Sequence, residues 1–179
     1  MTWIAGTLWD LLGGKKTAVA KNRPAKPPSA AKVLPIIEIV PRRTAMQDRY
    51  DAVVAEMKEL YGVRVRKWRK SSSGVAWTVR YINSGRIVKL IEAPYPKGPM
   101  SCVIFLHEIG HHAIGLGVHR PRCLEEYHVW VWALNTMREK GLNVTPAVER
   151  RMERSMRYAV SKARRRGLRE LPAELLQYA

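Results

Sequence analysis

The feature that most constrains this chain is the string His-Glu-Ile-Gly-His at positions 107–111, which lies inside the apolar stretch 103–114. That stretch has the length and apolar density of a buried helix. Residues four apart lie on one face of a helix about one turn apart, so the imidazoles of His107 and His111 can bind one metal ion. Glu108 then lies beside that ion. The sequence therefore predicts a domain built around a metal-binding helix.

A catalytic zinc site normally has three protein ligands and an open position for water, so one more His, Asp or Glu is required. The extended form of the motif would need Gly at position 114 and His at position 117, where Ile114 and Gly117 stand instead. Four side chains that follow the string can complete the set: His119, Glu125, Glu126 and His128. A ligand on a packed helix is held more rigidly than one in a loop, which favours a glutamate.

The choice between the two glutamates depends on which face of their helix is buried. Steps of three and four residues from Glu126 reach an apolar stripe made of Val129, Trp130, Ala133 and Met137. The same steps from Glu125 reach a more polar face. We therefore predict that His107, His111 and Glu126 bind the metal. Glu125 is either the alternative ligand or a carboxylate that orients a metal-bound histidine.

The segment before the metal-binding helix changes its period from helical to extended. Apolar residues recur at three- and four-residue spacing over 44–61, which predicts an amphipathic helix capped by Thr44. Residues 63–91 then alternate between apolar and polar, with breaks at 71–74 and 83–85. This pattern predicts a three-stranded antiparallel meander.

Prolines and glycines mark the limits of the helices that follow. The three prolines between positions 94 and 99 exclude regular structure until about Ser101. After the metal-binding helix, a second helix is expected at 123–140. A third is expected to begin with Thr145 as its cap and to end before Gly167. The expected fold class is α+β, with a basic helix at the carboxyl end.

This order of elements resembles the minimal gluzincin-type core of the ImmA/IrrE family of metallopeptidases, and the resemblance covers 44–140. In that family the two histidines of the string and a glutamate of the next helix, here Glu126, bind zinc. Characterised members cleave DNA-bound phage-type repressors. Ala and Asn typically stand three and four positions after the family's glutamate, where this chain has Val129 and Trp130. The zincin half of ArdC-type antirestriction proteins has a similar paired glutamate and is the second resemblance.

The ligand chemistry and the resemblance together predict a zinc-dependent endopeptidase that hydrolyses a protein substrate. Zinc lowers the pKa of a bound water towards about 7 and polarises the carbonyl that the water attacks. Glu108 is expected to act as the catalytic residue, taking the proton of the water and later returning it to the leaving amine.

The charge balance predicts a second partner. The chain has 32 Lys and Arg against 15 Asp and Glu, a formal net charge of +17. Such a balance is typical of proteins that contact nucleic acid. Trp68 lies in the basic segment 64–70, and the expected last helix carries a second basic set: Arg150, Arg151, Arg154, Arg157, Lys162, Arg164, Arg165 and Arg166. The alternative function is therefore a nucleic-acid-binding or virion-associated structural protein on a zincin scaffold.

Composition along the chain suggests three segments: a basic amino-terminal arm and linker at 1–43, a metallopeptidase core at 44–142 and a basic helical extension at 143–179. Cys102 and Cys123 are too few for a disulfide framework. No secretory signal is evident, and no stretch approaches the roughly 20 apolar residues that span a membrane. We expect a reduced protein in the cytoplasm of a bacterial or phage-infected cell, or in a virion.

Overall fold

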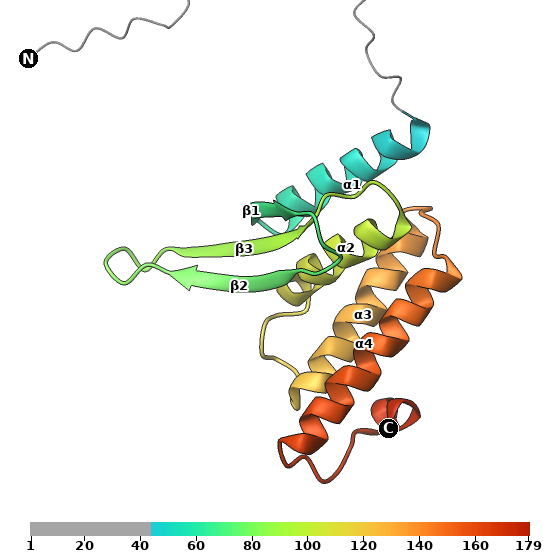
Figure 1. The fold of residues 1–179 in the computed structure, drawn as a ribbon. Helices are drawn as coiled ribbons and strands as arrows, with labels where there is room; N and C mark the ends of the chain where they lie inside the picture. Colours follow the sequence, from blue (N-terminus) through green and yellow to red (C-terminus); the bar gives the residue numbers. More distant parts are fainter. Residues whose placement is uncertain (1–43) are drawn as a thin grey trace, which may run out of the picture. The chain divides into compact units, whose positions relative to one another are not determined.

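The structure, a computed structural model, describes residues 44–179. The predicted arm and linker at 1–43 lies outside these residues. The described part is of the α+β class, as predicted, with the elements in the order drawn in Figure 1. They are α1 (Ala45–Leu60), β1 (Val63–Arg69), β2 (Val75–Arg80), β3 (Ile87–Pro94), α2 (Pro99–Ala113), α3 (Arg122–Glu139), α4 (Pro146–Arg165) and the short 3₁₀ helix η1 (Ala173–Tyr178).

The three strands form one sheet in the order β1-β3-β2, with β2 antiparallel and β1 parallel to the central β3. The prediction of an antiparallel meander is therefore wrong. Alternation determines which face of a sheet a side chain occupies, but it does not determine which strands are neighbours. The last four residues of β3 are all buried, whereas those of β1 and β2 are mostly exposed or half-buried. The most buried strand takes the centre of the sheet.

Capping residues, a proline and a glycine determine where α1 and α2 begin and where α1 ends. The Thr44 side chain accepts a hydrogen bond from the backbone of Gln47 at 3.2 Å, and α1 ends before Gly62, whose φ is +61°. α2 begins at Pro99, four residues before the predicted stretch 103–114, because proline is tolerated at the first position of a helix. The Ser101 hydroxyl accepts a hydrogen bond from the backbone N–H of Gly98 at 3.2 Å.

α2 is the central element of the core. Every residue from Cys102 to His112 is buried, and the helix packs against β3, α3 and α4. The largest fully buried side chains of α2 are Phe105, Leu106 and Ile109. The segment 143–179 belongs to the same core, because α4 contributes Val148, Met156 and Val160 to it. Within the described residues, no helix is long and apolar enough to cross a membrane.

Candidate metal centre

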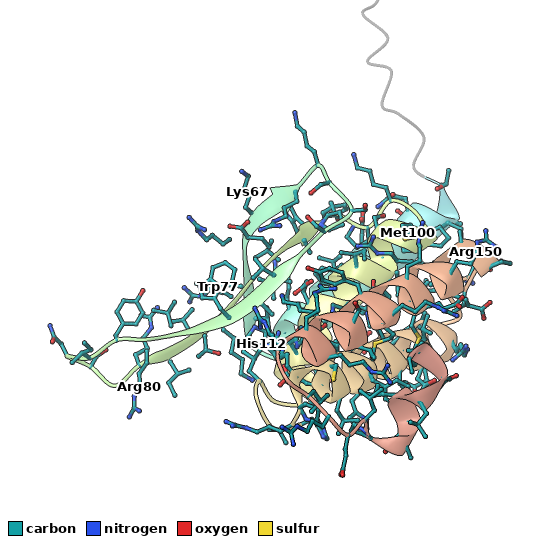
Figure 2. The ribbon with its side chains drawn as sticks, turned by 60° about the horizontal axis from the view of Figure 1, so that its bottom comes forward. Lys67, Trp77, Arg80, Met100, His112 and Arg150 are labelled. Atoms are coloured by element: carbon teal, nitrogen blue, oxygen red, sulfur yellow. The ribbon has the colours of Figure 1, made fainter. Side chains whose placement is uncertain are left out.

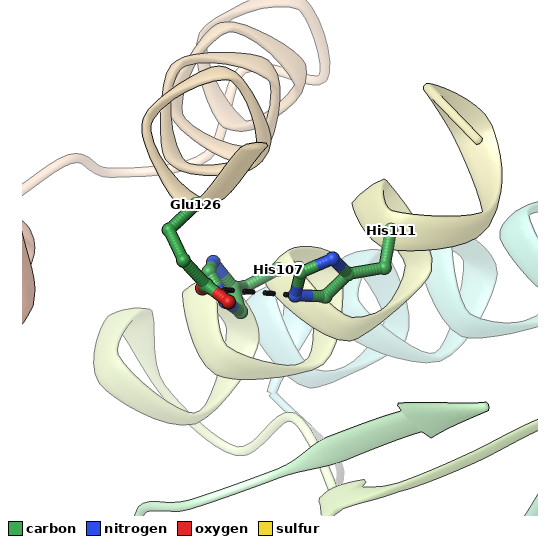
Figure 3. Close-up of side chains that lie close together, drawn as sticks. All are labelled: His107, His111 and Glu126. Atoms are coloured by element: carbon green, nitrogen blue, oxygen red, sulfur yellow. Dashed lines mark ion pairs between the residues drawn. The ribbon is translucent and has the colours of Figure 1, made fainter. Parts of the chain in front are cut away.

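Three side chains from two helices converge beside the middle of α2 (Figure 3). The nitrogens of His107 and His111 and a carboxylate oxygen of Glu126, a residue of α3, all lie within 4.8 Å of one another. Glu126 Oε2 lies 3.3 Å from Nε2 of His107 and 3.7 Å from Nε2 of His111. The structure therefore brings together the three residues predicted as ligands, and this group can hold a metal ion.

Gly110 allows α3 to approach α2 closely enough for Glu126 to reach the histidines. A Cβ atom at this position would lie 2.9 Å from Cε3 of Trp132 and 3.0 Å from Cγ1 of Val129, both on α3. These separations are shorter than ordinary van der Waals contacts, so a side chain at position 110 would force Trp132 and Val129 to move. Val129 is fully buried, in agreement with the apolar stripe predicted from Glu126.

Glu125 is fully buried and contacts the ring nitrogen of His111 that lies away from Glu126. Its Oε1 lies 3.1 Å from Nδ1 of His111, and its Oε2 accepts a hydrogen bond from the backbone N–H of Gly117 at 2.6 Å. A carboxylate on Nδ1 turns Nε2 of the same ring towards the metal position and strengthens it as a ligand. Glu125 therefore occupies the orienting role that the sequence left as its second option.

The other two histidines of α2 are held differently. The ring of His107 packs against Trp130 with the ring centres 4.6 Å apart, and its Nδ1 is buried with no hydrogen-bond partner among the described residues. His112 points away from the group, and its Nε2 lies 3.1 Å from the carbonyl oxygen of Leu90 in β3. Figure 2 shows His112 where the helices meet the sheet. His112 thus fixes α2 against β3 and is not a ligand.

His111 and Glu126 have the protonation states that binding a cation requires. Burial and the neighbouring His107 charge lower the pKa of His111 to about 4, so its imidazole is neutral at pH 7 and free to bind a metal. Burial alone would raise the pKa of Glu126. The hydrogen bond to His107 and the charges of His107, His111 and Arg122 outweigh it and lower that pKa to about 2.

Glu108 lies next to the group and is also buried. Burial and, secondarily, the charge of Glu126 raise the pKa of Glu108 to about 8, although Arg69 and Arg122 oppose the shift. A raised pKa makes a carboxylate a stronger base, which suits proton transfer near neutral pH. Glu108 therefore has the burial, the position and the basicity of a general base.

Gly74, just before β2, determines where the Glu108 side chain can lie. A Cβ atom on Gly74 would lie 2.6 Å from Cδ of Glu108 and closer still to Cγ and Oε1. If Glu108 acts as a general base, Gly74→Ala should displace its carboxylate and lower kcat by about 10²-fold, the cost of a misplacement of about 1 Å, with metal content unchanged. Gly98→Ala is the matched control, since a Cβ there meets nothing within 4 Å. Equal kcat values for the two variants would contradict this role of Gly74.

The chain was compared with protein-family models, with curated proteins and with solved structures. No protein-family model, no curated protein and no solved structure matches the chain. A function for this protein is therefore inferred from the geometry of the His107, His111 and Glu126 group and from its surroundings.

Proposed function

We propose that this protein is a zinc-dependent endopeptidase that hydrolyses a protein substrate. The observation that carries the proposal is the convergence of His107, His111 and Glu126 beside the buried Glu108. Two imidazoles and one carboxylate form a ligand set that zinc accepts, whereas magnesium and calcium prefer sets made of oxygen alone. Three protein ligands also leave one position for water or substrate, as in catalytic zinc sites.

The residues around the group can perform the steps of peptide hydrolysis. When bound, zinc supplies the Lewis acidity that polarises a carbonyl and acidifies a water. Glu108 accepts the proton of the attacking water and returns it to the leaving amine. Glu125 holds the ring of His111 in place throughout, through the contact at Nδ1.

The sheet offers a way to bind an extended peptide near Glu108. β2 is an edge strand, since it pairs only with β3 among the described strands. Gly74 precedes β2 and lies against Glu108, and both residues line one cavity. An extended peptide can add to a sheet edge through backbone hydrogen bonds. This arrangement favours a peptide substrate over a small molecule.

A relationship to the ImmA/IrrE family is part of the proposal, with ArdC-type zincin domains as the second choice. What supports it is a glutamate on the helix after the 107–111 string, at ligand distance from both histidines. At the place of the family's typical Asn, Trp130 packs against His107, and Glu125 makes the polar contact to the other histidine. The parallel pairing of β1 with β3 departs from the expected meander.

The experiment is digestion of a diverse peptide pool by the zinc-loaded full chain, with the products read by mass spectrometry. Internal cleavage that a chelator abolishes and added zinc restores would support the proposal. No cleavage of any peptide by protein shown to contain zinc would contradict it.

A nucleic-acid-binding function is the second candidate, and exposed arginines of α4 favour it. Arg150, Arg154 and Arg164 are exposed and have no ion pair with any residue in 44–179. Figure 2 shows Arg150 at the surface near one end of α4. The basic segment 64–70 contributes fewer free charges, because Glu92 pairs with Arg66 at 2.8 Å and with Arg69 at 3.0 Å.

Two tryptophans lie near the basic segment 64–70, and their surroundings differ. Trp68 packs against Tyr95 and Phe105, with ring centres 4.8 and 5.9 Å away. Trp77 of β2 instead lies under the guanidinium of Arg66, at 5.9 Å from its ring centre. Trp68 is exposed and Trp77 is half-buried, so Trp68 remains the candidate for stacking with a base.

If α4 binds phosphates, the triple substitution Arg150→Gln, Arg154→Gln and Arg164→Gln, here called the outer triple, should weaken binding to all DNA sequences alike. Each phosphate contact contributes about −0.9 to the slope of log affinity against log salt for duplex DNA. The outer triple should therefore flatten that slope by up to about three units between about 50 and 200 mM salt. Titrations of a labelled duplex measure it. An unchanged slope would assign these arginines to solubility.

A further inference from the structure

We propose, on the basis of the proposed peptidase function, that the substrate is a peptide segment rich in acidic side chains, recognised by cationic side chains that α4 places along the catalytic cleft. Two of the three converging residues, His107 and Glu126, lie in the wall of a cavity of about 920 Å³. Its lining includes Ser73 and Gly74 before β2, His107 and Glu108 of α2, Glu126 of α3 and one face of α4. A substrate that enters this cavity to reach His107 and Glu126 therefore lies near α4.

The α4 face that lines the cavity is cationic. It contributes Arg151, Lys162 and, just past the helix end, Arg166. None of these three forms an ion pair with a residue in 44–179. Arg122 also lines the cavity, but its charge is engaged by Glu126 at 3.1 Å. Among the residues of 44–179 that line the cavity, the only acidic ones are Glu108 and Glu126, which belong to the candidate metal centre itself.

Arg151 carries the clearest sign of a missing partner. Its Nη2 donates a hydrogen bond to the carbonyl oxygen of Ser72 at 3.1 Å, which fixes the guanidinium beside the β1–β2 connection. Its Nε is buried and has no hydrogen-bond partner among the described residues. A buried donor without a partner is costly, and a charge-assisted bond to a carboxylate would satisfy it.

The spacing along α4 suits an extended peptide. Arg151 and Arg166 are fifteen positions apart, which corresponds to about 22 Å of helix. A peptide in the β conformation covers that distance with about six to seven residues at about 3.3 Å each. Lys162 lies about 6 Å from Arg166 along the axis. Acidic side chains are therefore expected near both ends of a bound segment.

A peptide fits this cleft better than a nucleic acid does. A duplex is a convex rod that carries charge continuously along its backbone, whereas the cations without an ion pair here line a concave cavity. The exposed arginines of the outer triple lie elsewhere on α4 and do not line the cavity. Acidic side chains at intervals along an extended peptide can pair with Arg151, Lys162 and Arg166.

The test compares two variants that lose the same charge. In the cleft triple, Arg151, Lys162 and Arg166 are each replaced with Gln; the outer triple is the matched control. Both are made in the zinc-loaded full chain carrying Glu108→Gln, so that no probe is consumed. The probes are a fluorescein-labelled peptide of about ten residues alternating Glu and Ala, long enough to span the cleft, and its Gln counterpart. Binding is followed by fluorescence anisotropy.

We expect the Glu peptide to bind at least about tenfold more tightly than the Gln peptide, because several charge-assisted bonds act together. The cleft triple should abolish that preference, and the outer triple should change it less than about threefold. As a second variant, Lys162→Glu with Arg166→Glu should bind a Lys and Ala peptide more tightly than the parent does. This gain cannot arise from misfolding.

Three results would overturn the proposal. The first is an equal loss of the preference for the Glu peptide in the cleft triple and in the outer triple, which would show that only the net charge matters. The second is no preference for the Glu peptide. The third is a labelled DNA duplex that binds more tightly than the Glu peptide and loses its affinity in the cleft triple. Because binding is measured without turnover, a protein that binds the Glu peptide in this way but cleaves no peptide would contradict the peptidase proposal alone.

Discussion

Replacing Glu108 with glutamine is expected to lower the rate of peptide hydrolysis by about 10²- to 10⁴-fold, the usual contribution of a general base. The substitution keeps the shape of the side chain and removes the group that accepts the proton. Glu108 is buried beside the metal group, and its pKa is raised to about 8. It is therefore a much stronger base than the amide of glutamine or a water molecule. Initial rates on a cleaved peptide measure the effect.

Metal content decides how that result is interpreted. Zinc should remain in the Glu108→Gln protein, because Glu108 is not one of the three converging residues. Glu139→Gln, an exposed glutamate at the end of α3, is the matched control and should cleave at the parental rate. Parental activity in Glu108→Gln would mean that another group accepts the proton, and the proposed mechanism would be wrong.

Replacing Glu126 with alanine is expected to produce the largest loss of zinc affinity among the acidic residues of the site. It removes the one oxygen atom that lies near the Nε2 atoms of both histidines. Loss of a partner that only orients a ligand costs about 10- to 100-fold in affinity. We therefore expect more than about 100-fold for Glu126→Ala. Competition with a chromogenic chelator measures both affinities.

Glu125→Gln is the matched comparison for Glu126→Ala. It weakens the contact to Nδ1 of His111 but leaves the three ligand atoms in place. Its expected loss is therefore the smaller one, about 10- to 100-fold. A larger loss in Glu125→Gln than in Glu126→Ala, with both proteins folded by circular dichroism, would reverse the roles of the neighbouring glutamates.

The metal group could be predicted from the sequence because its determinants are local. A separation of four residues places His107 and His111 on one helix face whatever surrounds that helix. The apolar stripe that accompanies Glu126 identified the buried side of α3, and Val129 and Trp130 are indeed buried. The two buried thiols, Cys102 and Cys123, are free, as their number suggested.

Features that depend on distant segments were beyond the sequence pattern. Strand alternation is the same for a meander and for the observed order β1-β3-β2, so the central position of β3 could not be read from it. Glu125 is buried although its helical face is polar, because the backbone of Gly117 returns to donate to it. The basic residues of α4 seemed to form one outward surface, yet Arg151 and Lys162 line the cavity at the metal group. That division depends on how α4 packs against α2 and α3.

We propose that His107, His111 and Glu126 form a zinc site, and the zinc content of the purified full chain is the decisive measurement. Elemental analysis of protein purified without chelators and then dialysed should find one zinc per chain. A protein carrying both His107→Ala and His111→Ala should retain none, while His112→Ala, which alters the histidine that contacts Leu90, should retain the parental amount. No metal in the parent even after zinc is added, or equal zinc in the double variant, would contradict the claim.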